Sequence, residues 1–134
     1  MPATCQALPP TSARWRDLGA ALAVTAAAAL VAAGQAHIAT LLVLAPLAEE
    51  IVFRAGLQEA LLRRHRTARY ANASTALAFA AAHVAMRPGL WAGLTLLPAL
   101  LIGAVYERHR GLGRCVALHA ALNAAWLLRA HLHA

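Results

Sequence analysis

Residues 44–57 read LAPLAEEIVFRAGL and place three ionisable side chains, Glu49, Glu50 and Arg54, in an otherwise apolar segment. Glu50 and Arg54 are four residues apart with the acid first, which is the favourable order for an ion pair on a helix. Glu49 lies about 100° around the helix from Glu50 and has no such local partner. We therefore expect Glu49 to find its partner on another helix or to take up a proton.

The sequence around this segment is unusually apolar. Of its 134 residues, 61% are hydrophobic and 13% are charged, and the mean hydropathy is +0.59. Soluble domains are nearer half apolar and about a quarter charged. The apolar residues form blocks long enough to cross a bilayer as helices, at about 18–33, 38–57, 70–86, 90–106 and 112–128. This pattern predicts an all-α, polytopic transmembrane helix bundle of about five spans, with a tail over 1–16 and a single membrane domain over 17–134, and it argues against a soluble enzyme.

The net charge of +7 comes from twelve basic residues, all of them arginine. With about five spans, most arginines outside the blocks fall on one side of the membrane, namely Arg14, Arg16, Arg63, Arg64, Arg66, Arg69, Arg108, Arg110 and Arg114. Only Arg87 and Arg129 fall on the other side. The positive-inside rule then predicts a cytoplasmic N-terminus. This clustering favours contact with membrane lipids over nucleic acid, and residues 58–69 predict a basic surface helix on anionic headgroups or, alternatively, a ledge for substrate docking.

Two further blocks carry polar pairs at helical spacing. Phe79 and His83 are four residues apart, and so are His119 and Asn123, so each pair shares one face of a helix. If the three polar faces point inward, Glu49, His83, His119 and Asn123 converge, and their depths agree within the error of the block boundaries. These residues also have structural interpretations. Asn123 or either histidine could form an interhelical hydrogen bond, and Phe79 could be a core residue.

A glutamate and a histidine around a water molecule permit hydrolysis, because the carboxylate can act as general base. A second histidine and an asparagine can donate to a developing oxyanion. Pro46, just before the acids, is expected to free a backbone carbonyl and to kink the helix where a cavity is needed. Cys5 and Cys115 form no metal-binding or redox motif and are interpreted as spare thiols.

Together, Glu49-Glu50-x-x-x-Arg54, Phe79-x-x-x-His83 and His119-x-x-x-Asn123 resemble the three signature motifs of the CPBP family. These are the intramembrane glutamic endopeptidases, which include type II CAAX prenyl proteases and bacteriocin-processing or self-immunity membrane proteins. The resemblance covers a protease core at about 41–128. It implies a catalytic base, Glu49, a water shared with His83, an oxyanion site of His119 and Asn123, and supporting roles for Glu50, Arg54 and Phe79.

The resemblance also implies a membrane-anchored peptide or protein as substrate. The short chain resembles exosortase-associated bacterial members that act on C-terminal sorting signals. Family members usually carry more spans before the first motif, so a homo-oligomer or a partner could complete the cavity. The alanine- and arginine-rich, lysine-free composition is typical of a high-GC bacterial genome and predicts a multi-pass protein of the cell inner membrane.

The leading hypothesis is therefore an intramembrane endopeptidase that needs no cofactor. A zinc site of Glu49, His83 and His119 is an alternative, although the sequence has no HExxH motif. A non-catalytic membrane scaffold or immunity protein of the same fold is another, but a scaffold has no need to bury an unpaired acid. A small proton-coupled transporter is a third, in which Glu49 and His83 carry protons; the sequence shows no internal repeat that would favour it.

Overall fold

The computed structural model describes residues 22, 24–29, 31–64 and 67–132, and in this part of the chain it contains helices and no strand. The predicted all-α class is therefore confirmed. The predicted tail over 1–16 and the start of the first apolar block lie outside the described residues. Helical residues of that block are described between 22 and 32, before a turn at Gly34, where φ is +75°.

Residues 44–57, which carry both glutamates and Arg54, lie in one continuous helical run from Ala36 to Arg63. The backbone hydrogen-bond register changes four times along this run. The register follows the order α2 (Ala36–Ala39), π-helix η1 (Thr40–Leu44), α3 (Ala45–Glu50), π-helix η2 (Ile51–Gln58) and α4 (Glu59–Arg63). π-helical turns are rare and occur most often at functional sites. Here two of them flank the short α-helical segment that carries Pro46 and both glutamates.

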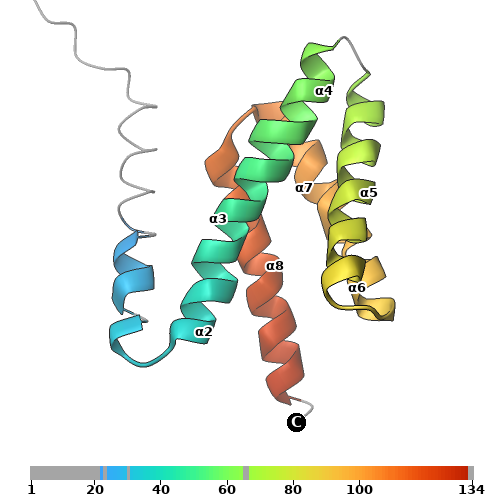
Figure 1. Ribbon diagram of the computed structural model, residues 1–134. Coiled ribbons are helices and arrows are strands. Elements are labelled where there is room, and N and C mark those ends of the chain that lie inside the picture. Colours follow the sequence, from blue (N-terminus) through green and yellow to red (C-terminus); the bar gives the residue numbers. More distant parts are fainter. Residues whose placement is uncertain (1–21, 23, 30, 65–66, 133–134) are drawn as a thin grey trace, which may run out of the picture.

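The remaining helices are α5 (Ala68–Met86), α6 (Leu90–Leu94), α7 (Leu96–His109) and α8 (Leu112–Leu132). α5 begins at an N-cap threonine, because the side chain of Thr67 accepts the Tyr70 N–H at 3.3 Å. α7 ends where Arg110 adopts a left-handed conformation with φ +47°. The chain therefore runs along the bundle in alternating directions, with α4 at one end and α6 and the end of α8 at the other (Figure 1).

α5 packs against α7, and a glycine permits their close approach. A Cβ added to Gly103 would collide with the side-chain amide of Asn72, so a larger residue here would displace that amide. The Asn72 amide donates to the Leu100 carbonyl at 3.0 Å. α8 packs against α7 and against the helical run that carries the glutamates.

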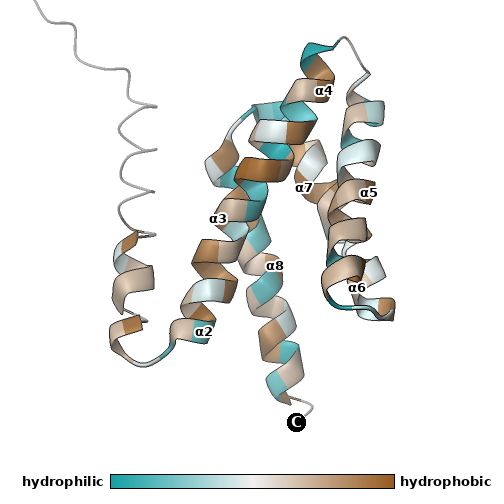
Figure 2. Ribbon diagram, in the orientation of Figure 1, coloured by the Kyte–Doolittle hydropathy of each residue, from teal (hydrophilic) through white to brown (hydrophobic). Residues whose placement is uncertain are grey.

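Charged and polar side chains lie in the interior beside apolar ones, and many large apolar side chains lie on the surface. Among the described residues the buried side chains include alanines but also charged and polar groups, whereas many leucines, valines and tryptophans are exposed. Figure 2 shows where the hydrophobic and hydrophilic residues occur along these helices. Two helical runs, Ala36–Arg63 and Leu90–His109, are long and apolar enough to cross a membrane. The apolar exterior is what a lipid environment favours. The count of five spans and the cytoplasmic N-terminus stay predictions.

Candidate active site

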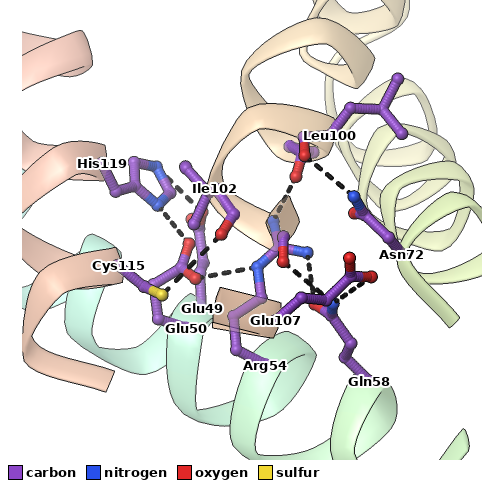
Figure 3. Close-up of polar contacts among 12 residues, drawn as sticks. Glu49, Glu50, Arg54, Gln58, Asn72, Leu100, Ile102, Glu107, Cys115 and His119 are labelled. Carbon is purple, nitrogen blue, oxygen red and sulfur yellow. Dashed lines mark hydrogen bonds and ion pairs between the residues drawn. The ribbon is translucent and has the colours of Figure 1, made fainter. Parts of the chain in front are cut away.

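The two glutamates of α3 meet His119 of α8 in the middle of the bundle (Figure 3). Nδ1 of His119 lies 2.8 Å from Oε1 of Glu50. An ionised carboxylate can only accept hydrogen bonds, so Nδ1 carries the proton and donates it. This bond fixes the ring and presents the other nitrogen, Nε2, to Glu49, whose Oε2 lies 3.6 Å away. Glu49 thus has its partner on another helix, at ion-pair distance rather than hydrogen-bond distance.

Glu50 is fully buried, and its second oxygen accepts a hydrogen bond from Nε of Arg54 at 3.0 Å. The predicted i, i+4 ion pair is therefore confirmed. The structure adds that Glu50 also holds His119, which the spacing alone did not indicate, because the two residues are 69 positions apart. Glu50 joins a cation on its own helix to an imidazole on another.

Glu49 has a more open environment than its neighbour. Its side chain is 27% exposed, and among the described residues its Oε2 has no hydrogen-bond partner. Both His83 and His119 lie close enough to interact with it electrostatically. Although the side chain is partly exposed, its Oε2 atom is itself buried. A buried carboxylate oxygen without a hydrogen-bond partner is uncommon in proteins, and it often marks a functional group or an ordered water.

His83 of α5 is oriented by its own helix. Its Nδ1 lies 3.0 Å from the Phe79 carbonyl, which can only accept, so Nδ1 donates and Nε2 is the acceptor of the neutral ring. The imidazole stacks on Phe79 with ring centroids 4.3 Å apart. Phe79 is also edge-on to His119, with centroids 5.9 Å apart, and to Phe53, at 5.0 Å. The buried Phe79 ring therefore separates and supports the two imidazoles.

A polar ladder continues the Glu50–Arg54 pair along the helix. Gln58 stands four residues beyond Arg54, and both side chains are fully buried. Arg54 donates to the Ala99 carbonyl at 2.9 Å and to Oε1 of Gln58 at 3.4 Å. Gln58 in turn donates to the Gly103 carbonyl at 3.1 Å. The ladder anchors the site on the backbone of α7.

Gln58 belongs to the site although its sequence context did not predict this. The available signal was its position, since it extends the spacing of Glu50 and Arg54 by a further four residues. The sequence does not indicate Asn72 either, because a single amide on an alanine-rich helix has no distinguishing pattern. Cys115 stands near the start of α8, fully buried, and its thiol donates weakly to the Ile102 carbonyl at 3.9 Å.

Asn123 contacts a different part of the helical run. Its side-chain amide donates to the Leu41 carbonyl at 2.8 Å. In the π register of η1 the Ala45 N–H bonds to the Thr40 carbonyl, and the next donor would be residue 46. Residue 46 is proline and has no N–H. The carbonyl that Pro46 was expected to free is thus that of Leu41, and Asn123 supplies its donor, which is the structural alternative to an oxyanion role.

In the described part of the chain, no group of three His, Cys, Asp or Glu side chains is arranged to hold a metal ion. The geometry therefore gives no support to the zinc alternative of Glu49, His83 and His119. What the residues can do is bind and move protons. A carboxylate with an unbonded oxygen lies 3.6 Å from the ring of His119 and within electrostatic range of His83, and each ring is held by a bond at its Nδ1. That set is able to position and deprotonate a water molecule.

Comparison with known proteins agrees with the motifs. Residues 33–125 match the family model described as type II CAAX prenyl endopeptidase Rce1-like. Searches of curated proteins and of solved structures gave no significant match. The matched region covers more than half of the chain and includes the acid pair, both histidines and Asn123. The chain therefore belongs to the type II CAAX prenyl endopeptidase Rce1-like family, a family of membrane-associated proteases.

Proposed function

We propose that this protein is a glutamic-type intramembrane endopeptidase that hydrolyses a peptide bond of a membrane-anchored substrate by direct attack of water. Membership of a protease family supports the reaction class. The single observation that carries the mechanism is the environment of Glu49. Its unbonded oxygen faces Nε2 of His119 at 3.6 Å and lies within electrostatic range of His83.

In the proposed reaction Glu49 takes a proton from a water molecule whose oxygen forms a bond to the carbonyl carbon. His83 accepts the second O–H of that water at Nε2 and so orients it. His119, in its imidazolium form, is stabilised by Glu50 and donates from Nε2 to the developing oxyanion. The proton held by Glu49 passes to the amide nitrogen, the C–N bond breaks, and a carboxylic acid and an amine leave.

Glu50, Arg54 and Phe79 hold this arrangement in place. Glu50 and Arg54 fix the ring of His119 from behind, as the ion pair and hydrogen bond require. Phe79 stacks on His83 and supports His119. Asn123 has two amide hydrogens, and the bond to Leu41 uses one, so the second is available to the oxyanion if a substrate reaches it.

We place the activity in a bacterial inner membrane, with a multi-pass chain, membrane lipids as surroundings and no cofactor. The substrate class is a membrane-anchored segment, with C-terminal sorting signals as the first candidates. The active form is proposed to be a homo-oligomer or to include a partner protein. These points rest on the sequence pattern and on the family, and each is open to experiment.

The experiment uses the purified chain in liposomes with a panel of membrane-anchored peptides, with and without a chelator. We expect the wild type to cleave in chelator and His83→Ala to be slower by about 100-fold, as for the loss of a residue that assists proton transfer. His109→Ala is the matched control, because His109 is exposed at the end of α7, and it should retain the wild-type rate.

Other outcomes point to the alternatives. Cleavage that the chelator abolishes would move the site to zinc. Cleavage unchanged in His83→Ala would remove His83 from the mechanism. Absence of cleavage across the panel, together with proton transport by the wild type in the same liposomes, would favour the transporter.

A further inference from the structure

A cavity of 410 Å³ lies at the end of the bundle opposite α4. Its lining comes from two helices far apart in the sequence: Trp91 of α6, and Trp126, Arg129 and Ala130 of α8. Figure 1 shows that α6 and the last turns of α8 share this end of the molecule. The catalytic proposal uses none of these residues. His119 lies about 15 Å along α8 from Arg129, at 1.5 Å per residue.

The cavity carries a positive charge that nothing in the described part of the chain neutralises. Its four described glutamates lie elsewhere: Glu49 and Glu50 in α3, Glu59 in α4 and Glu107 near the end of α7. Every described ion pair involves Glu49, Glu50 or Glu59, and none includes Arg129. A guanidinium beside an open cavity is a site for an anion.

The surface around the cavity is that of a membrane protein near the bilayer interface. Trp91 and Trp126 are 68% and 59% exposed. The leucines that flank them are also exposed, namely Leu90, Leu94, Leu97, Leu128 and Leu132. Tryptophan rings concentrate at the level of lipid headgroups, where one part of the ring meets apolar chains and the N–H meets polar oxygens. Such surroundings suit an anion that carries acyl chains.

We propose that the Trp91–Trp126–Arg129 cavity binds the phosphate headgroup of an anionic phospholipid. The Arg129 guanidinium donates two parallel hydrogen bonds to phosphate oxygens. The indole N–H groups donate to phosphate or ester oxygens, and the acyl chains lie along the exposed leucines. The volume falls in the range of about 300–1,000 Å³ that small-molecule sites occupy. The site is independent of the proposed peptidase activity.

The test measures binding of phosphatidylglycerol to the purified chain in neutral detergent by native mass spectrometry. We expect Arg129→Gln to weaken binding by about tenfold, the effect of losing a charge-assisted hydrogen-bond pair. Arg114→Gln removes the same charge from an exposed residue at the other end of the bundle and should change binding by less than about twofold. Equal binding by Arg129→Gln and wild type, or an equal loss in the two variants, would overturn the proposal.

Two further experiments leave the residues that line the cavity unchanged. Soluble glycerol phosphate, which has the anion without the chains, should fail to compete; competition at equal affinity would make this a site for a free phosphate ester and contradict a lipid site. The protein has three tryptophans, so Trp15→Phe leaves only Trp91 and Trp126. In phosphatidylcholine bilayers, brominated phosphatidylglycerol should quench their fluorescence more than brominated phosphatidylcholine does. Equal quenching by the two lipids would also overturn the proposal.

Discussion

Glu49 and Glu50 are neighbours of the same type with opposite environments. Glu50 is fully buried, and each of its oxygens accepts a bond, one from Arg54 and one from His119. Glu49 is partly exposed and keeps an oxygen without a hydrogen-bond partner. A carboxylate already bonded on both sides is a poor proton acceptor, because accepting a proton would break a charged hydrogen bond. The geometry therefore favours Glu49 as the base and Glu50 as the residue that positions His119.

Replacement of Arg54 by lysine tests this support. Arg54 bonds at once to Glu50, Gln58 and the Ala99 carbonyl, which a lysine ammonium cannot reproduce with one nitrogen. We expect Arg54→Lys to lower the free energy of unfolding by about 2 kcal/mol, mostly through buried groups left without partners. Loss of helical circular dichroism on heating in detergent measures the change.

The chain offers a matched control for that prediction. Arg63 makes the same i, i+4 pair with Glu59, but its side chain is 78% exposed. Arg63→Lys should change stability by less than about 1 kcal/mol, as surface ion pairs do. If the two substitutions had equal effects, burial would not be the reason for the importance of Arg54.

At the scale of elements, a proline leaves one backbone carbonyl of the helical run without a backbone donor. The π register of η1 directs the Leu41 carbonyl to residue 46, where Pro46 has no donor, and Asn123 of α8 provides one. The sequence predicted a freed carbonyl near Pro46 and a helix through this segment. It could not predict the π register, because apolar composition is the same in both registers and the change depends on contacts with other helices.

A double substitution separates the structural role of Asn123 from a catalytic one. Asn123→Ala leaves the Leu41 carbonyl without a donor and should cost about 1–3 kcal/mol of stability. Pro46→Ala restores a backbone N–H in the i→i+5 position, so the double variant should regain most of that loss. Thermal unfolding of the wild type, the two single variants and the double variant gives the coupling free energy between positions 46 and 123.

The cleavage rates of the same four proteins distinguish the structural role of Asn123 from a catalytic one. If Asn123 only docks α8, the double variant should recover cleavage along with stability. If its second amide hydrogen serves the oxyanion, stability returns and cleavage does not. Additive losses of stability in the double variant would contradict the shared role of Pro46 and Asn123 at Leu41.

At the scale of the whole molecule, the composition predicted the helical class and most helix positions. α5, for example, begins at Ala68 where the sequence predicted about 70, and α8 runs to Leu132 rather than about 128. The spacing of charged and polar residues indicated which faces meet. The sequence could not reveal that His119 bonds to Glu50, that Gln58 is fully buried, or that Asn72 bonds to the backbone of α7, since those facts depend on how α7 and α8 pack. The number of membrane crossings depends on how these helices insert into a bilayer.

The predicted topology has a direct test. With about five spans the two ends of the chain lie on opposite sides of the membrane, with the N-terminus in the cytoplasm. A reporter that is active only outside the cytoplasm should therefore be active when fused after residue 134 and inactive when fused before residue 1. Activity at both ends, or at neither, would require an even number of crossings.

The central claim is that the Glu49 carboxylate deprotonates the attacking water. Glu49→Gln keeps the size of the side chain and removes its ability to take a proton, and Glu59→Gln makes the same change in α4, at the end of the helical run. The most direct measurement is the cleavage rate of both variants in liposomes, beside circular dichroism to verify folding. We expect Glu49→Gln to be folded and slower by at least about 100-fold, and Glu59→Gln to stay close to wild type. A folded Glu49→Gln that cleaves at the wild-type rate would contradict the central claim.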